Sequence, residues 1–247
     1  MERIDTCKGN NMYTYDMRVG FSHSDVNHRM TIPAIIDAYQ DASCFHSEDL
    51  GVGFFYLEPK QLVWVINYWD VEFIRMPEYP EKITVGTFPY DFKGFLGSRN
   101  FFLKDEKGEF ISKANSLWVL MDWENMRPAK VPPEVKDAYV LEPKLDMDYQ
   151  PRKIVIPEGA TKSDQVSITI GEHHLDANGH VNNGQYIKIA MGFVPQNLNY
   201  KRLRVEYRNQ AHLGDVIYPV VYRTDSSYTV SLGNEEGVAY SVIELCY

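Results

Sequence analysis

An acid, an imidazole and three amides fall within eight residues in the C-terminal half of the chain. The segment reads Asp176-Ala177-Asn178-Gly179-His180-Val181-Asn182-Asn183, and a helical pattern follows it. Asp176 could attack a carbonyl carbon or activate water, and His180 is of the residue type that ordinarily titrates near neutral pH. Asn178 offers both a hydrogen-bond donor and an acceptor. This segment is therefore the first candidate for catalysis, although Asp and Asn taken singly more often cap helices or hold turns.

Composition and charge limit the class of protein. The 247 residues are 44% hydrophobic, which is enough to bury a core in one large domain or in two of about 120 residues. A net charge of −9 argues against a nucleic-acid partner, because phosphates favour a basic surface. Cys7, Cys44 and Cys246 form no C-x-x-C pair, which favours a reducing compartment. Residues 1–5 are polar, and no apolar run is long enough to cross a bilayer. We expect a cytoplasmic protein without a transit peptide or an integral membrane segment.

Parts of the sequence occur twice. Val71-Glu72-Phe73-Ile74-Arg75 matches Val205-Glu206-Tyr207-Arg208-Asn209, an offset of 134 residues (205 minus 71). The segment Asp25-Val26-Asn27-His28 matches the Asp176 segment with an offset of 151 (176 minus 25). Such agreement predicts one structural unit used twice. The first copy then holds 17 extra residues (151 minus 134) between these two points, which must lengthen its helix or the loop that follows.

Each copy shows a helix among strands. Thr31 can cap a helix that Gly51 can end, and a shorter helix is predicted from Asn183 through Phe193, because Pro195 forbids its continuation. Strand patterns surround both helices. They cover residues 13–21, 62–74, 82–88, 95–104 and 110–123 in the first copy, and 166–170, 202–208, 215–223, 228–232 and 238–245 in the second.

A long antiparallel sheet that wraps a central helix is the hotdog fold. We predict an α+β protein of two tandem hotdog domains. The N-terminal domain would span residues 1–123 and the C-terminal domain 166–247. Residues 124–165 hold six of the thirteen prolines and many charges, which is typical of a linker.

The quoted segments resemble the acyl-ACP thioesterases, enzymes that release fatty acids from acyl carrier protein (ACP). The likeness rests on Asp176-x-Asn178-x-His180-Val181-Asn182-Asn183-x-x-Tyr186 followed by Val205-Glu206-Tyr207-Arg208. It extends to the first copy in Trp64-Val65, Arg75-Met76-Pro77 and Ala114-Asn115-Ser116-Leu117-Trp118 before Asp122. The resemblance implies catalytic roles for Asp176, Asn178 and His180, and an acyl-chain site in the N-terminal copy.

The same residues suit a thioester without reference to the family. A thiolate leaves readily, so the reaction needs chiefly a nucleophile and support for the carbonyl oxygen. The free N–H groups at the start of a helix can give that support, and Gly179 would let a substrate approach the backbone closely. Whether Asp176 attacks the carbonyl or whether it or His180 activates water is left open.

The chain departs from the plant members of the family at one strand end. Those proteins have an acidic residue and then a cysteine where this chain has Gln210 and Ala211. Gln210 can bind water but cannot accept its proton, so base duty shifts toward His180 or Asp176. The predicted catalytic set is Asp176, Asn178, His180 and Gln210. In the first copy, the histidine of Asp25-Val26-Asn27-His28 lies one position closer to the acid, and that copy is predicted to be inactive.

The leading hypothesis is hydrolysis of fatty acyl-ACP to free fatty acid and holo-ACP, without cofactor or metal. His173, His174 and His180 with Asp176 match no metal-ligand spacing. Lys188, Lys201 and Arg202 could dock the acidic ACP, although the alternate arginines of this strand are expected simply to solvate one face. The alternatives are an acyl-CoA thioesterase, a non-catalytic acyl-ligand-binding hotdog protein, or a hydratase or dehydratase. A homodimer is possible.

Overall fold

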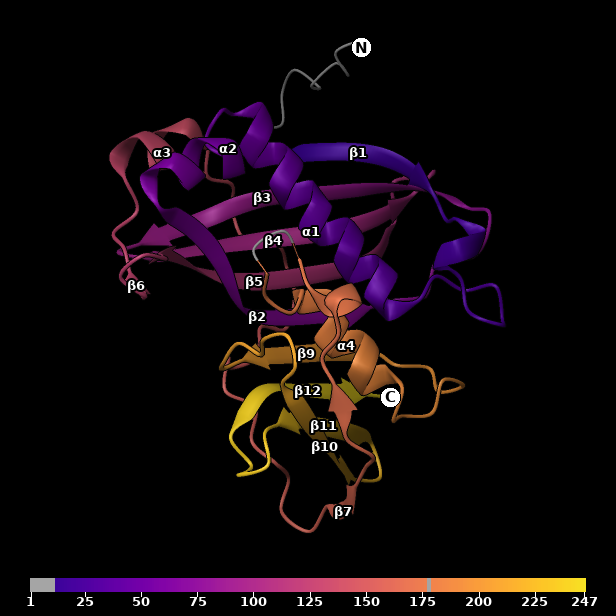
Figure 1. Ribbon diagram of the computed structural model, residues 1–247. Coiled ribbons are helices and arrows are strands. Elements are labelled where there is room, and N and C mark those ends of the chain that lie inside the picture. Colours follow the sequence, from indigo (N-terminus) through magenta and orange to yellow (C-terminus); the bar gives the residue numbers. More distant parts are fainter. Residues whose placement is uncertain (1–11, 177–178) are drawn as a thin grey trace. The chain divides into compact units, whose positions relative to one another are not determined.

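The computed structural model describes residues 12–176 and 179–247, and it forms two compact units (Figure 1). The first unit contains residues 12–65 and 74–148, and the second contains residues 66–73 and 149–247 with the two-residue gap already noted. Strand β2 (Leu62–Phe73) therefore contributes to both units. The division into residues 1–123, 124–165 and 166–247 stays a prediction.

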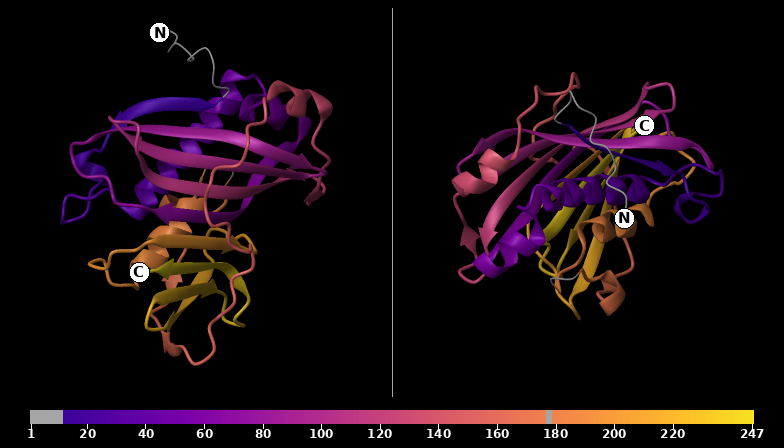
Figure 2. Two further views of the ribbon diagram at one scale, coloured as in Figure 1. Left: turned by 180° about the vertical axis from the view of Figure 1, so that it is seen from behind. Right: turned by 90° about the horizontal axis from the view of Figure 1, so that it is seen from above.

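The first unit places a long helix on an antiparallel sheet, as predicted. Helix α1 (Ile32–Asp49) begins where the Thr31 hydroxyl accepts a hydrogen bond from the Ala34 N–H at 3.4 Å. Its buried face lies against strand β3, and Figures 1 and 2 show it crossing one face of the sheet. The sheet order is β1 (Tyr13–Arg18), β3 (Lys82–Lys93), β4 (Leu96–Asp105) and β5 (Phe110–Asp122).

Strand β3 runs five residues beyond the predicted end at Phe88. The sequence favours a break there because Pro89 has no N–H for the ladder. The pairing with β4 instead continues through an irregularity between Pro89 and Asp91. A bulge thus lets the strand pass the proline.

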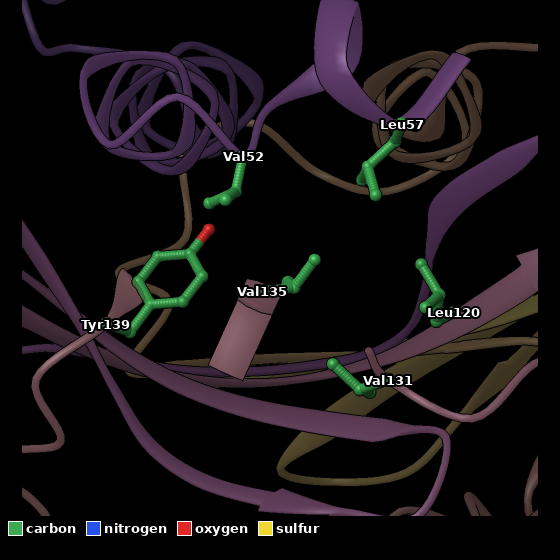
Figure 3. Close-up of a cluster of buried hydrophobic side chains, with 6 residues drawn as sticks. All are labelled: Val52, Leu57, Leu120, Val131, Val135 and Tyr139. Atoms are coloured by element: carbon green, nitrogen blue, oxygen red, sulfur yellow. The ribbon is translucent and has the colours of Figure 1, made fainter. Parts of the chain in front are cut away.

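Short elements close one end of the first unit. Val52, Leu57 and Leu120 pack there with Val131, Val135 and Tyr139, so part of the predicted linker belongs to this unit's core (Figure 3). The elements are α2 (Phe54–Leu57), η2 (Glu58–Lys60), β6 (Arg127–Pro128) and α3 (Pro133–Ala138). A further short helix, η1 (Phe21–His23), follows β1 near the Lys82 end of β3.

A polar pair lies buried beside this cluster. The Arg99 Nη1 donates to His46 Nδ1 at 3.0 Å and to the Thr87 hydroxyl at 3.3 Å, and the Arg99 guanidinium lies over the Tyr139 ring. A guanidinium offers only donors, so His46 Nδ1 must accept and the imidazole must be neutral. Burial, and then the positive charge of Arg99, lowers the pKa of His46 to about 3.

This neutral histidine makes stability depend on pH. The folded-state pKa lies below the unfolded value, so the unfolded chain binds an extra proton as pH falls from about 6.5 to about 3. We expect that proton to lower the free energy of unfolding by up to roughly 4 kcal/mol across this window. Urea titrations of wild type and His46→Gln between pH 7 and 4 measure it, because the variant should lose less stability over the same interval. His23→Gln, at an exposed histidine, is the control. Parallel pH dependences for wild type and His46→Gln would contradict the assignment.

The second unit repeats the arrangement with a shorter helix. Helix α4 (Asn183–Met191) packs against β11 and β12. Helix α1 is nine residues longer than α4 (18 against 9), and the other eight of the 17 extra residues follow α1, where α2 and η2 lie before β2. The sheet order is residues 66–73 of β2, then β9 (Arg202–Tyr207), β12 (Ala239–Cys246), β11 (Ser227–Gly233), β10 (Val216–Arg223) and β7 (Thr161–Asp164).

The predicted strand 166–170 is wrong in its bounds. Two short strands, β7 and β8 (Ile168–Thr169), instead pair with successive parts of β10. Between them the chain lies opposite Pro219, whose carbonyl accepts the Gln165 N–H but which has no N–H to donate. The ladder is interrupted at that point.

The strands that match in the sequence also pair in space. Position 70 of β2 is equivalent to position 204 of β9 by the 134-residue offset, and these two residues, Asp70 and Arg204, are direct antiparallel partners. On the same face Arg202 lies 3.6 Å from the buried Asp70 and 2.5 Å from Glu72, while Arg204 bonds Glu244 at 2.7 Å. The expectation that these arginines merely solvate a face is therefore wrong.

The end of the predicted linker covers this charged face. The Gln150 N–H donates to Asp70 at 2.9 Å, and the Ile154 N–H donates to Glu206 at 3.0 Å. Arg204 in turn donates to the carbonyl of Pro151 at 2.5 Å. These partners offset part of the cost of burying the charges, but burial of Asp70 outweighs its hydrogen bond and the nearby arginines and raises its pKa.

Within the described ranges, no helix combines the length and hydrophobicity needed to cross a membrane.

Candidate active site

The candidate segment is a tight turn that leads into α4. The Gly179 N–H donates to the Asp176 carbonyl at 3.0 Å, and the Asp176 N–H donates to the His180 carbonyl at 2.8 Å. An isolated bridge between Leu175 and Val181 closes the turn. Gly179 has a φ of +73°, a conformation that glycine adopts without strain. These backbone hydrogen bonds thus hold Asp176 and His180 opposite each other in the turn.

The Asp176 carboxylate takes part in this turn. Its Oδ1 accepts the backbone N–H of His180 at 3.3 Å, and both side chains are half-buried. One carboxylate oxygen therefore holds the turn, while the residue still reaches solvent. Asn178, the third predicted catalytic residue, lies outside the described residues.

The first unit contains the same turn with different side chains. Asp25 accepts the backbone N–H groups of Asn27 at 2.8 Å and Arg29 at 2.9 Å, and a bridge between Ser24 and Met30 closes the turn. His28 takes the left-handed place of Gly179, with a φ of +63°. Arg29 consequently occupies the place of His180.

That exchange places a cation beside the Asp25 carboxylate. Arg29 Nη2 lies 3.3 Å from the Asp25 carboxylate. Partial burial of Asp25 acts in the opposite direction, but the hydrogen bonds from Arg29 and Asn27 and the arginine charge hold the pKa of Asp25 below its usual value. An arginine cannot accept a proton from water at neutral pH, so Arg29 cannot take the part of base for which His180 is a candidate.

Helix α4 begins directly after the candidate turn. The Asn182 side chain accepts the Gly184 N–H at 2.8 Å and caps the helix. Among the described residues, none accepts a hydrogen bond from the N–H of Asn183, the first helical residue. The start of α4 can therefore offer an N–H group and the positive end of a helix dipole to an oxyanion.

A second segment is bonded to the turn. The Ala211 carbonyl accepts the Val181 N–H at 3.4 Å, and the buried Ala211 N–H donates to the Tyr186 hydroxyl at 2.9 Å. Burial raises the pKa of Tyr186 to about 12, which keeps the phenol neutral. Gln210 precedes this anchor and is exposed, with no hydrogen bond to another described residue.

The imidazole of His180 contacts His212, a residue that was not predicted from the sequence to belong to the site. The rings of His180 and His212 lie edge to face with centroids 5.5 Å apart. His212 follows Gln210 by two positions, and that closeness to a predicted site residue was the only signal available. The structure thus brings together Asp176, His180 and His212, with Gln210 in the same bonded loop as His212.

The histidines do not form a metal centre in the described part of the chain, where no three potential ligands cluster. The His173 and His174 rings stack on each other, and His174 Nδ1 accepts the Gly171 N–H at 3.0 Å. Burial, and then the charge of His173, lowers the pKa of His174.

Comparison with known proteins identifies the family of this chain. A profile of the acyl-ACP thioesterase N-terminal domain matches residues 10–139, and one of the acyl-ACP thioesterase C-terminal domain matches residues 159–241. The chain belongs to the acyl-ACP thioesterase family. The predicted resemblance is confirmed.

Relatives in this family include plant thioesterases. Oleoyl-acyl carrier protein thioesterase 2, chloroplastic, of Arabidopsis thaliana is 26% identical over 231 residues, which are 81% of this chain and 63% of that protein. Dodecanoyl-[acyl-carrier-protein] hydrolase, chloroplastic, of Cinnamomum camphora is 26% identical over 83% of this chain and 56% of that protein. The chain thus spans less than two thirds of the length of these relatives.

Solved acyl-ACP thioesterases share the fold. A structure from Bacteroides thetaiotaomicron has a TM-score of 0.86 at 22% identity and covers 96% of this chain and 97% of its own. The 12:0-ACP thioesterase of Umbellularia californica has a TM-score of 0.83 at 20% identity, with 96% of each chain covered. The tandem hotdog fold is therefore confirmed.

Tyr186 should hold the two segments of this family site together. Tyr186→Phe leaves the buried N–H of Ala211 without its acceptor, so we expect the free energy of unfolding to fall by about 1–2 kcal/mol. Amide hydrogen exchange should accelerate at residues 210–213. Chemical denaturation and exchange mass spectrometry measure the two effects. Tyr218→Phe, at an exposed tyrosine of β10, is the matched control. Unchanged exchange at residues 210–213 would show that the loop is held by other contacts.

Proposed function

We propose that this protein is a thioesterase that hydrolyses fatty acyl-ACP to free fatty acid and holo-ACP in fatty acid biosynthesis. The observation that carries the proposal is the Asp176–His180 turn at the start of α4, in a chain of this family. The turn supplies a carboxylate, an imidazole and a helix N-terminus side by side. Those are the groups that thioester hydrolysis needs.

The reaction assigns a part to each group. His180 accepts a proton from water as the water oxygen bonds to the thioester carbon, and the N–H of Asn183 supports the oxyanion. The C–S bond then breaks, and the thiolate takes the proton from His180. Asp176, held by the backbone N–H of His180, orients the water. Asn178 and Gln210 complete the proposed site as hydrogen-bonding residues without a base function.

The N-terminal unit would bind the acyl chain. Its turn has lost the base and carries an internal ion pair, so it is free for another task. Hence we assign acyl binding to residues 1–123 and catalysis to residues 166–247, with residues 124–165 connecting them. The compartment we propose is cytoplasmic, from the separated cysteines.

Substitution of the two central residues tests the function. We expect His180→Ala and Asp176→Asn to lower kcat/KM by about 10²–10⁴-fold on acyl-ACP, because each removes a group that acts in the transition state. Asp176→Asn retains an oxygen that can accept the His180 N–H, so the turn should persist. Thiol release and free acid are measured together over several chain lengths.

His28→Ala, in the equivalent turn of the first unit, is the matched control and should keep its kcat/KM. Full activity in His180→Ala and Asp176→Asn would refute the site. Inertness of the wild type toward every thioester would favour a non-catalytic acyl-binding protein, which the glutamine at position 210 makes the second candidate.

Docking of the acidic carrier protein should depend on salt. Lys188 and Lys201 are exposed, whereas Arg202 is already paired with Glu72 and Asp70 and is withdrawn from the docking cluster expected from the sequence. We expect kcat/KM for acyl-ACP to fall several-fold between 50 and 500 mM NaCl, because salt screens exposed charges. Lys201→Glu should reduce that salt dependence.

Acyl-CoA with the same acyl chain is the reference substrate for this measurement. Equal kcat/KM values and equal salt responses for the two substrates would instead support an acyl-CoA thioesterase.

A further inference from the structure

Two imidazoles from separate segments meet at the candidate active site. His180 belongs to the turn before α4 and is half-buried, while His212 belongs to the loop after β9 and is exposed. Their rings make an edge-to-face contact at 5.5 Å between centroids, with an interplanar angle of 62°. The contact places a second titratable ring against the proposed base.

The backbone holds His212 in this place. On its N-terminal side, Ala211 bonds both Val181 and Tyr186. On its C-terminal side, the His212 N–H donates to the Asp215 carboxylate at 2.8 Å, and the Asp215 N–H donates to the His212 carbonyl at 3.1 Å. The ring therefore stands on a segment fixed at both ends, although its own surface is open to solvent.

We propose that His212 is a positioning residue for thioester hydrolysis, which acts through His180; this inference rests on the function proposed above. The neutral His212 ring packs against His180 and orients it toward the attacking water. A positive charge at position 212 would repel a positive charge on His180, and a negative charge there would attract it. Gln210 cannot exert such an effect on His180, because an amide carries no charge.

Other titratable groups lie on the same elements and are common to all variants below. Asp176, Asp215 and Tyr240 interact electrostatically with Tyr186 of α4, and His174 of the 3-10 helix η3 (Glu172–His174) accepts the Asn182 N–H through its carbonyl. A change confined to position 212 leaves them in place.

A charge series at position 212 tests the proposal by pH profile. The variants are His212→Gln, His212→Lys and His212→Glu, and the readout is the midpoint of the acid limb of kcat/KM on acyl-ACP. Two unit charges this far apart at a solvent-exposed site shift a titration by roughly half a pH unit. We expect the midpoint to fall in His212→Lys and to rise in His212→Glu, and the neutral variant to lie between them. His212→Gln should also lose several-fold in kcat, because the packing partner is gone.

Proton NMR separates this inference from the function on which it rests. The C2 proton resonance of His180, assigned by its loss in His180→Gln, is titrated in the same variants and reports whether or not the chain turns over a thioester. The order of midpoints should match that of the pH profiles. The control pair is His173→Lys and His173→Glu, since the His173 ring contacts His174 instead. Midpoints that are equal in all three His212 variants, or that move alike for lysine and glutamate, would overturn the proposal.

Discussion

The hydrogen bond from the His180 backbone to the Asp176 carboxylate is the constraint on which the candidate site depends. It folds the chain back on itself within five residues and so brings an acid and an imidazole to the same end of α4. The Asn182 cap starts the helix directly afterwards, and Ala211 joins the loop of Gln210 to the same turn. Each group of the site is thus placed by backbone bonds of this one segment, and the sheet of the second unit supports it from below α4.

Duplication shows which parts of the turn are structural and which are chemical. The bridge, the aspartate that accepts backbone N–H groups and the left-handed residue occur in both units. The left-handed position is His28 in one copy and Gly179 in the other, and the position after it is Arg29 in one copy and His180 in the other. In the first unit Arg29 forms an ion pair with the aspartate, whereas the second unit has an imidazole at this position. The same turn therefore forms in both units although its side chains differ.

Local signals in the sequence predicted the local structure well. The Thr31 and Asn182 caps, the two helices and most strands follow from residue type and spacing, because those features depend on near neighbours. The two repeat offsets predicted a longer helix or a longer following loop in the first copy, and both are found. The repeat made Asp70 and Arg204 equivalent in the sequence, but nothing in the pattern showed that they would pair across neighbouring strands or be buried. The backbone N–H groups that bond the carboxylates of this face, those of Gln150 and Ile154, belong to a segment that the sequence predicted to be a linker.

The contact of His212 with His180 could not be predicted from the sequence, because it joins residues that are distant along the chain. It arises from the tertiary bonds of Ala211, not from spacing. The sequence also placed Arg202 in the cluster that docks ACP, but Arg202 forms an ion pair with Glu72 on the neighbouring strand. Long-range pairing decides both outcomes.

A crystal structure with an acyl-pantetheine ketone, in which a methylene group replaces the thioester sulfur, tests the central claim most directly. The account predicts that the ketone oxygen lies within hydrogen-bonding distance of the Asn183 N–H, with Asp176 and His180 beside the carbonyl carbon. An acyl group bound with its carbonyl at the Asp25 turn, or away from both turns, would contradict it.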